Sequence, residues 1–229
     1  MSSPLGDRPL HLLDDATATA LVADPDAAHA RARALSPGSL AELVVAVPPP
    51  AAAFSRRDQL NAGYPAAAEA VAAHGFTPYL RPVGGRLAVY DQGSLVVHLL
   101  SGHDEPRLHI RERFALLGEA MAGALIGLGV DARVGRVPGE YCEGEFSVND
   151  SGRAKLVGTG QRITRHGYLF SAVIMVHGAD RARAALEAAY PLMGLDLRPE
   201  TVGCVADAVP GITLDEVRDA TFAAIGGLL

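Results

Sequence analysis

The 229-residue chain has no tryptophan, and its aromatic residues make up only 5% of it. The apolar fraction of 49% must therefore come mostly from alanine, valine and leucine, which is still enough for the core of one domain. No apolar run reaches the roughly 18 residues that span a bilayer. The first residues, MSSPLGDRPLHLLDDA, lack the basic stretch and apolar run of a secretory signal. These absences predict a cytoplasmic protein without a membrane segment.

Cysteine and positive charge are also scarce. The two cysteines, Cys142 and Cys204, are too few and too far apart for a disulfide framework or a zinc site. The net charge of −6 argues against a nucleic-acid partner, because nucleic-acid binders usually carry a basic excess or a basic stripe. None of the eight histidines belongs to an HxH or HxxxH pair, so no metal site is expected.

Lysine is almost absent. Lys155 is the only lysine, and the other 19 basic residues are arginine. A lysine that persists alone suggests a task for which arginine is poorly suited. A compact ammonium can approach one carbonyl or phosphate oxygen in a tight pocket, whereas a planar guanidinium cannot. The alternative interpretation is that Lys155 has no special task and is an exposed residue on a strand.

Hydrophobic periodicity and turn residues predict five helices, over 14–35, 65–74, 110–128, 182–189 and 213–229. Strands are predicted over 8–13, 40–47, 77–83, 87–92, 94–100 and 130–137, with three more, at about 146–149, 154–164 and 168–176. Residues 51–63 read as a loop. Thr213 and Glu216 form a capping-box pattern at the start of the last helix. Because the elements do not alternate as βαβ units, the pattern favours an α+β fold with a mainly antiparallel sheet, in a single domain over residues 1–229.

Two adjacent glycines, Gly84 and Gly85, lie between the strands predicted at 77–83 and 87–92 and are flanked by Arg81 and Arg86. Guanidinium groups beside bare backbone N–H groups suit a carboxylate or a phosphate. The alternative interpretation is an ordinary hairpin turn with solvated arginines.

Cys142 has three glutamates as sequence neighbours, Glu140, Glu143 and Glu145. A reactive thiolate needs positive surroundings, so these carboxylates would raise the pKa of the thiol and disfavour attack. Cys142 could equally be a small packing residue. Cys204 and His98 lie in apolar segments, which favours a core cysteine and a core histidine with a satisfied hydrogen bond.

Two motifs, read together and in this order, resemble those of one family. The first is Arg81-x-x-Gly84-Gly85-Arg86, and the second, about seventy residues later, is Lys155-x-x-Gly158-x-x-Gln161-Arg162. Over about residues 8–226 the chain resembles the lipoate–protein ligases and octanoyl/lipoyl-transferases. The resemblance implies an α/β sandwich shared with biotin–protein ligases and related to the cores of class II aminoacyl-tRNA synthetases.

The leading function that this resemblance implies is attachment of a lipoyl or octanoyl group to the lysine of a lipoyl carrier domain. Such carriers are those of the 2-oxoacid dehydrogenase complexes or the glycine cleavage H protein. ATP and Mg²⁺ would activate the acid, and Lys155 would hold the acyl-adenylate. The acyl chain would lie in a tunnel, with substrate contacts from Arg81, Gly84, Gly85, Arg86, Gly158 and Gln161.

Two alternatives remain open. In an ATP-independent transferase of the same family, Cys142 would carry the acyl group as a thioester, and no cofactor would be needed. The second alternative is a non-catalytic protein that binds lipoate or acyl groups. Two departures from the family motivate this alternative. No C-terminal accessory domain follows, so a separate partner protein would have to supply one, and Tyr90 stands where the family has a histidine before Asp91. The sequence does not choose between octanoate and lipoate.

Overall fold

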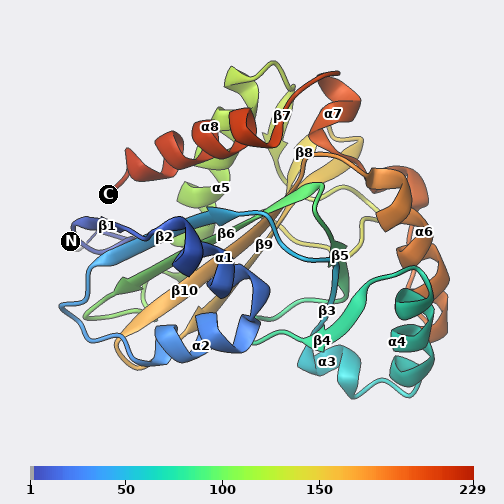
Figure 1. Ribbon diagram of the computed structural model, residues 1–229, viewed down its shortest axis with the longest axis horizontal. Helices are drawn as coiled ribbons and strands as arrows, with labels where there is room; N and C mark the ends of the chain where they lie inside the picture. Colours follow the sequence, from blue (N-terminus) through green and yellow to red (C-terminus); the bar gives the residue numbers. More distant parts are fainter. Residues whose placement is uncertain (1–2) are drawn as a thin grey trace.

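A seven-stranded sheet forms the centre of the computed structural model, which describes residues 3–229 (Figure 1). Residues 1 and 2 of the predicted domain lie outside the described residues. In spatial order the strands are β1 (Leu10–Leu12), β2 (Ala41–Ala46), β6 (Ser94–Gly102), β10 (Gly167–Met175), β9 (Ala154–Ile163), β8 (Val148–Asp150) and β7 (Ala132–Val134). Every neighbouring pair is antiparallel except β1 and β2. The prediction of a mainly antiparallel sheet is confirmed.

A smaller sheet lies beside the first, with β3 (Ala51–Phe54) between β4 (Thr77–Leu80) and β5 (Ala88–Tyr90). The prediction that residues 51–63 form a loop is wrong, because this segment holds β3 and the short helix α3 (Arg56–Gln59). All four residues of β3 are buried, so its sequence, AAAF, shows no polar–apolar alternation. Without that alternation, a short alanine-rich strand lacks the usual signature of period two.

The helix predicted over 14–35 is two helices, α1 (Asp15–Ala23) and α2 (Pro25–Arg33). Asp24 separates them in an extended conformation, which is the conformation that a residue before proline prefers. Its carboxylate accepts a hydrogen bond from the Asp26 N–H, and this bond caps α2. The single-helix prediction is therefore wrong at the Asp-Pro pair, where one helix ends and another begins.

Two long helices, α5 (Ile110–Gly127) and α8 (Leu214–Gly226), cover one face of the large sheet (Figure 1). α5 confirms the amphipathic pattern, since Leu117, Met121 and Leu125 are fully buried against the strands. The capping box that begins α8 is also present: the Thr213 hydroxyl accepts from the Glu216 N–H, and the Glu216 carboxylate accepts from the Thr213 N–H.

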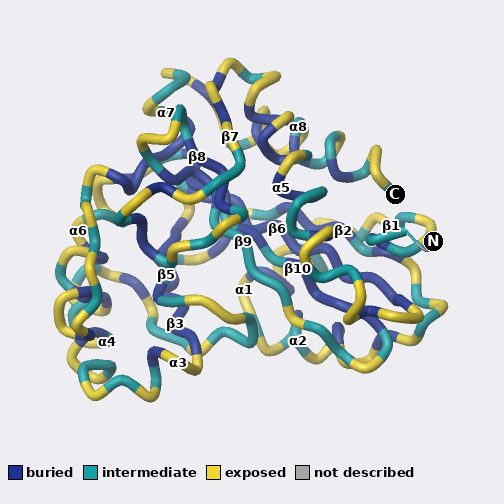
Figure 2. The backbone as a smooth tube through the Cα atoms, turned by 180° about the vertical axis from the view of Figure 1, so that it is seen from behind, coloured by how far each residue is buried: buried dark blue, intermediate teal, exposed yellow. Residues whose placement is uncertain are grey.

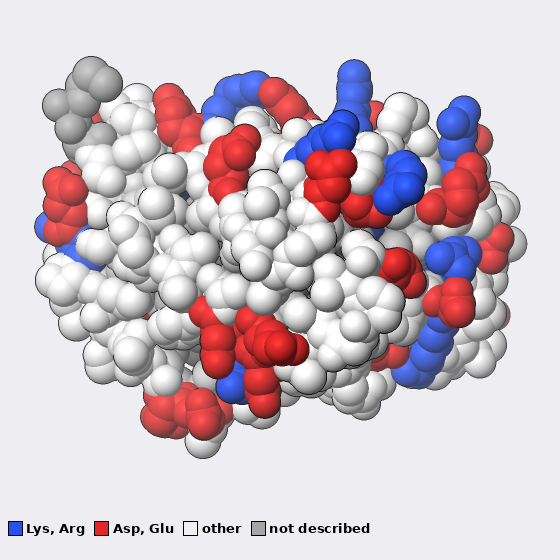
Figure 3. All heavy atoms as spheres, turned by 90° about the horizontal axis from the view of Figure 1, so that it is seen from above, with Lys and Arg blue, Asp and Glu red and all other residues white. Residues whose placement is uncertain are grey.

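The opposite face is covered by α1, α2 and the small sheet, against which α4 (Tyr64–Ala73) and α6 (Ala179–Ala189) pack. The remaining elements are the 3₁₀ turns η1 (Pro191–Met193) and η2 (Pro199–Thr201) and the short helix α7 (Val205–Ala208). Figure 2 shows buried residues concentrated in the central strands. None of the helices in residues 3–229 combines the length and the hydropathy needed to cross a bilayer. Seen from above, acidic and basic side chains are interspersed on the surface (Figure 3).

Candidate functional site

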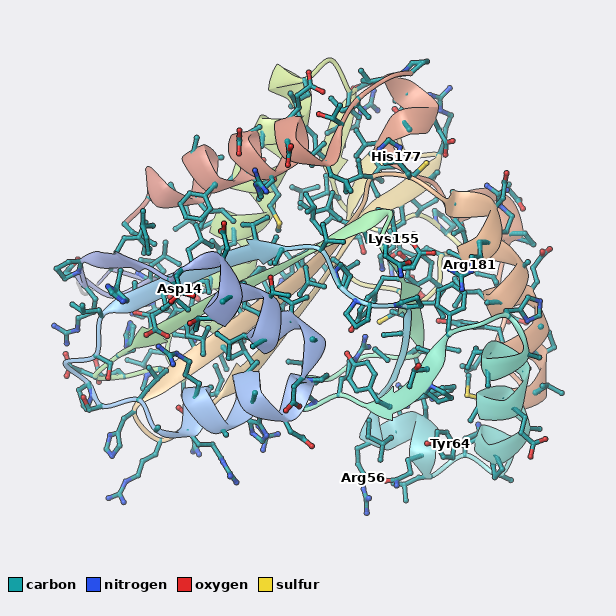
Figure 4. The ribbon with its side chains drawn as sticks, in the orientation of Figure 1. Asp14, Arg56, Tyr64, Lys155, His177 and Arg181 are labelled. Carbon is teal, nitrogen blue, oxygen red and sulfur yellow. The ribbon has the colours of Figure 1, made fainter. Side chains whose placement is uncertain are left out.

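A largely apolar cavity lies between the large and the small sheet and brings the two sequence motifs together. From the first motif it is lined by Arg81 and Gly84, and from the second by Lys155 and Gly158. Cys142 lies on the same wall. Residues about seventy positions apart in the chain thus meet around one space. Figure 4 shows Lys155 near the middle of the molecule, where the two sheets approach each other.

Glycines on strand β9 leave room for this cavity. A Cβ atom on Gly158 would lie 3.3 Å from Lys155 Cε, and one on Gly160 would lie 3.1 Å from Val83 Cγ2. Both distances are tighter than ordinary van der Waals contact. A side chain at either position would therefore press on the cavity wall or fill the space.

Cys142 has a left-handed backbone conformation, with φ of 45°. Non-glycine residues rarely adopt it, and such strain persists only where the surroundings hold the residue in place. Here the Cys142 N–H donates to the Tyr190 hydroxyl at 2.7 Å, and that hydroxyl donates to the Leu87 carbonyl at 2.9 Å. Its thiol sulfur lies 3.1 Å from the Arg86 backbone nitrogen and 3.4 Å from Arg81 Nη2, both of which can donate to it.

The charge around Cys142 favours the thiolate. Burial raises the pKa of the thiol, but the Arg81 guanidinium, the Lys155 ammonium and the Arg86 N–H lower it, and the net pKa lies below the ordinary value. A thiolate that is partly exposed in positive surroundings is the reactive form of cysteine. The sequence-based expectation of a raised pKa is therefore wrong.

The three neighbouring glutamates do not act on the thiol as their sequence positions suggested. Glu143 pairs with Arg136 at 3.2 Å, and Glu145 pairs with Arg111. Glu140 is buried, and its carboxylate accepts hydrogen bonds from Ser147 Oγ at 2.8 Å, from the Gly144 N–H at 2.9 Å and from the Val137 N–H at 3.3 Å. Each carboxylate is engaged with other groups, so the arginine and lysine charges dominate at the sulfur.

Lys155 is buried, with 1% of its surface exposed, so it is not a solvated strand lysine. Its ammonium donates to the backbone carbonyls of Cys142 at 2.8 Å and Tyr141 at 3.1 Å, and it lies 3.5 Å from Glu140 Oε1. The ammonium also lies 4.8 Å from the centre of the Tyr141 ring. The lysine therefore joins the loop that contains Cys142 to β9 through hydrogen bonds and places a positive charge next to that loop.

The Gly84–Gly85 segment is not a hairpin turn, because β4 and β5 both pair with β3 and not with each other. Gly85 has φ of 107°, and a Cβ there would lie 2.7 Å from Cys142 Sγ and 2.6 Å from Arg81 Nη2. Glycine is therefore needed at this position for close approach to the thiol. Arg86 Nη1 pairs at 3.2 Å with Asp58, which is fully buried.

Gln161 lies further along β9, with its side-chain amide directed at α5. Its carbonyl oxygen accepts from Arg113 Nε at 2.7 Å, and its nitrogen donates to the Ile110 carbonyl at 3.3 Å. These bonds join β9 to the start of α5. A contact between Gln161 and substrate stays a prediction.

A second hollow, open to solvent, also borders Cys142. Its lining includes Arg57, Arg86, Glu143, Tyr190 and Arg198. Cys142 lines both spaces and so lies where the apolar cavity meets this second hollow. No local pattern in the sequence indicates that Tyr190 belongs to this site, because its role comes from a hydrogen bond that spans 48 residues. Within residues 3–229, no group of three or more His, Cys, Asp or Glu residues could hold a metal ion.

Comparison with known proteins agrees with this arrangement. A family model described as the lipoyl protein ligase A/B catalytic domain matches residues 49–226. The chain is 31% identical over 124 residues to an octanoyl-[GcvH]:protein N-octanoyltransferase of Exiguobacterium sibiricum, covering 50% of this chain and 41% of that protein. A protein of the same name from Lysinibacillus sphaericus is 25% identical over 112 residues, covering 49% and 40%. The matched regions thus span about two fifths of the length of these curated relatives.

Solved structures share the fold. A lipoate-protein ligase A bound with ATP has a TM-score of 0.71 at 20% identity, covering 96% of this chain and 85% of that one. A bipartite lipoate protein ligase from Thermoplasma acidophilum has a TM-score of 0.67 at 22% identity, covering 96% and 82%. The α/β fold predicted from the resemblance is confirmed. With the family model matching most of its length, the chain belongs to the lipoyl protein ligase A/B catalytic domain family.

Proposed function

We propose that the protein transfers an octanoyl or lipoyl group between carrier proteins without ATP, and that Cys142 carries the acyl group as a thioester. The observation that carries this proposal is the setting of the Cys142 sulfur. It lies at the junction of the apolar cavity and the open hollow, within hydrogen-bond distance of two donors. The pKa of the thiol is lowered despite burial, because Arg81, Lys155 and the Arg86 N–H favour the thiolate.

In the first step, the Cys142 thiolate attacks the acyl carbonyl of the donor. A carbon–sulfur bond forms, the bond from the carbonyl to the donor's lysine nitrogen breaks, and the amine leaves after taking up a proton. In the second step, the lysine amine of an acceptor carrier attacks the thioester. A new amide forms, a proton leaves the nitrogen, and Sγ departs as a thiolate. The same positive groups that lower the thiol pKa stabilise this leaving sulfur.

Lys155 serves this mechanism through the loop that holds the nucleophile. Its bonds to the Tyr141 and Cys142 carbonyls fix the main chain of that loop, and its charge favours the anionic sulfur. In the ligase mechanism, which the resemblance made the leading interpretation, this ammonium would instead contact an acyl-adenylate. With two carbonyls and Glu140 already around it, the ammonium is directed at the Cys142 loop, which supports the thioester mechanism.

The carrier proteins that we propose as partners follow from the comparisons with known proteins. The two relatives are named for octanoyl-[GcvH] as the donor, and the archaeal ligase structure was described together with an E2 lipoyl domain. We therefore take a glycine cleavage H protein as donor and a lipoyl domain of a 2-oxoacid dehydrogenase complex as acceptor. The open hollow gives a carrier lysine access to Cys142, while the acyl chain occupies the apolar cavity.

The test is an acyl-transfer assay with and without ATP and Mg²⁺. Octanoyl-GcvH and an unmodified lipoyl domain are mixed with the enzyme, and the lipoyl domain is followed by intact mass. We expect octanoylation without ATP and its loss in Cys142→Ser, with Cys204→Ser as the matched control. If the product instead forms from free octanoate only when ATP is added, and Cys142→Ser still makes it, the protein is a ligase.

A further inference from the structure

Tyr190 joins the two chain segments that meet at the Cys142 sulfur. Its hydroxyl accepts a hydrogen bond from the Cys142 N–H at 2.7 Å and donates one to the Leu87 carbonyl at 2.9 Å. Leu87 directly follows Arg86, whose backbone N–H donates to Cys142 Sγ at 3.1 Å. One phenol therefore holds both the main chain of Cys142 and the segment that supplies a hydrogen-bond donor to its sulfur.

The tyrosine is itself held in place at the C-terminal end of α6. Its N–H donates to the Leu186 carbonyl at 2.9 Å, and its carbonyl accepts from the N–H groups of Met193 at 3.0 Å and Leu195 at 3.1 Å. Only 2% of Tyr190 is exposed, and burial raises the pKa of its hydroxyl well above the ordinary value, with a further rise from the nearby Cys142 sulfur. The phenol therefore stays neutral, and it can donate and accept at the same time.

The main chain of Cys142 depends on such contacts, because its φ of 45° lies in the left-handed region. A non-glycine residue stays there only where its surroundings hold it. Both of its main-chain polar groups are bound by side chains distant in the sequence: the N–H by the Tyr190 hydroxyl, and the carbonyl by the Lys155 ammonium at 2.8 Å. Without the phenol, the N–H side of this hold is lost.

A second side chain bridges the same two segments, and this one carries a charge. Arg81 Nη2 donates to the Arg86 carbonyl and lies 3.4 Å from Cys142 Sγ. A change at Arg81 therefore alters both the position of the segment and the electric field at the sulfur. The Tyr190 bridge is neutral, so removing its hydroxyl alters position while the charges of Arg81 and Lys155 remain.

We propose that Tyr190 is a positioning residue for acyl transfer, whose hydroxyl holds Cys142 and the segment 84–87 at the separation at which the Arg86 N–H donates to the thiolate. This inference rests on the proposed function, because it takes Cys142 to be the nucleophile. It adds a residue from the end of α6, outside both sequence motifs, to the groups that set the reactivity of the thiol.

The test compares Tyr190→Phe with the wild type in two measurements. The rate of Cys142 alkylation by iodoacetamide is followed against pH by peptide mass spectrometry, and acyl transfer from octanoyl-GcvH to a lipoyl domain is followed by intact mass. Without the phenol the Arg86 N–H moves off the sulfur, so the midpoint of the alkylation profile should rise by about one pH unit, the value of one hydrogen bond to a charged group. Transfer at neutral pH should slow by about tenfold, in proportion to the lost thiolate.

Tyr168→Phe is the matched control, because it removes the hydroxyl of another buried tyrosine. That hydroxyl donates to the Leu5 carbonyl at 2.9 Å, and Tyr168 lines neither the cavity nor the hollow. Its midpoint should equal that of the wild type. Cys204 in the same chain reports loosening of the fold, since its buried thiol would then be alkylated faster. If Tyr190→Phe lowers stability but keeps the wild-type midpoint and transfer rate, the phenol is only structural and the inference is wrong.

Gly85→Ala is a second variant, which tests the same separation with the phenol in place. The added Cβ would lie 2.7 Å from Cys142 Sγ, so the segment and the sulfur must move apart. The midpoint should rise here too, and an unchanged midpoint overturns the inference even where Tyr190→Phe does not fold. Alkylation needs no thioester, so these profiles are separate from the transfer chemistry, whose own failure would show as transfer that persists in Cys142→Ser.

Discussion

The two cysteines of this chain show how differently a fold can treat one side chain. Cys204 is 3% exposed, and burial raises the pKa of its thiol. Cys142 is also largely enclosed, but three positive or N–H groups around it lower its pKa despite that burial. The nearest carboxylate partner of Cys204 is Asp207, which accepts from its N–H at 2.9 Å, whereas the glutamates near Cys142 are engaged with other groups. The difference between the two thiol pKa values thus comes from the electrostatic surroundings.

Lys155 connects the two regions. Its backbone carbonyl accepts from the Gly203 N–H at 3.3 Å, next to Cys204, while its ammonium bonds the carbonyl of Cys142 at 2.8 Å. The packed segment around Cys204 therefore supports the lysine whose charge favours the Cys142 thiolate. Cys204 lies in the supporting structure, and Cys142 lies in the candidate site.

The largest expected difference between the cysteines is in catalysis. Cys142→Ser should lower the rate of acyl transfer by more than about 10³-fold, as loss of a nucleophile does in other enzymes. Cys204→Ser should leave the rate within about threefold, because Cys204 lines neither the cavity nor the hollow. Initial rates with octanoyl-GcvH measure both variants, and equal losses would remove the distinction drawn here.

The next effect concerns Lys155 and stability. Lys155→Met leaves the buried Glu140 without its ammonium partner, so we expect the free energy of unfolding to fall by about 3–5 kcal/mol. Urea unfolding followed by circular dichroism measures it, and adding Glu140→Gln should recover part of the loss. Arg111→Ala breaks the exposed pair with Glu145 and serves as the control, with an expected cost below about 1 kcal/mol. A Lys155→Met cost as small as this control would contradict a structural role for the buried pair.

Arg81 provides a test of the electrostatic difference itself. Arg81→Gln removes the guanidinium that lowers the Cys142 pKa, so the thiol should titrate at a higher pH. Because the thiolate fraction at a given pH falls as the pKa rises, alkylation of Cys142 by iodoacetamide at neutral pH should slow severalfold. Peptide mass spectrometry after timed alkylation follows both cysteines, and Cys204 should react as in the wild type. A Cys142 rate that Arg81→Gln leaves unchanged would assign the low pKa to other groups.

The smallest effect is expected from Cys204→Ala. This change removes one buried sulfur from a packed segment and should cost about 1 kcal/mol of stability. The pH dependence of Cys142 alkylation should stay the same, since Cys204 is not among the groups that shift its pKa. Urea unfolding and the alkylation profile together check the variant, and a shifted profile would show that the two regions are coupled.

The elements that local signals specify were predictable from the sequence. The periodic helix at 110–128 and the Thr213–Glu216 capping box both rest on residues within four positions of each other, and the structure has both. The prediction at 14–35 was wrong because it passed over the Asp-Pro pair, a local signal that ends one helix and begins another. The prediction at 51–63 was wrong because a short strand of buried alanines lacks the alternation of period two.

The candidate site was predictable where the motifs themselves supply the residues. Lys155, Arg81 and the Gly84–Gly85 pair were candidates from the sequence, and all border the cavity or the thiol. The electrostatics of Cys142 were not predictable, because they depend on which partner each glutamate finds. Glu145 pairs with Arg111, which is 34 residues away. Sequence proximity put negative charge at the thiol, and the folded chain put positive charge there.

The most direct test of the thioester mechanism is to trap the intermediate. The enzyme is mixed with octanoyl-GcvH in the absence of ATP and of an acceptor, quenched in acid, digested and analysed by peptide mass spectrometry. The mechanism predicts an octanoyl group on the peptide that contains Cys142, released by hydroxylamine, with the Cys204 peptide unmodified. An unmodified Cys142 peptide in an enzyme that is active in the same preparation would contradict the mechanism.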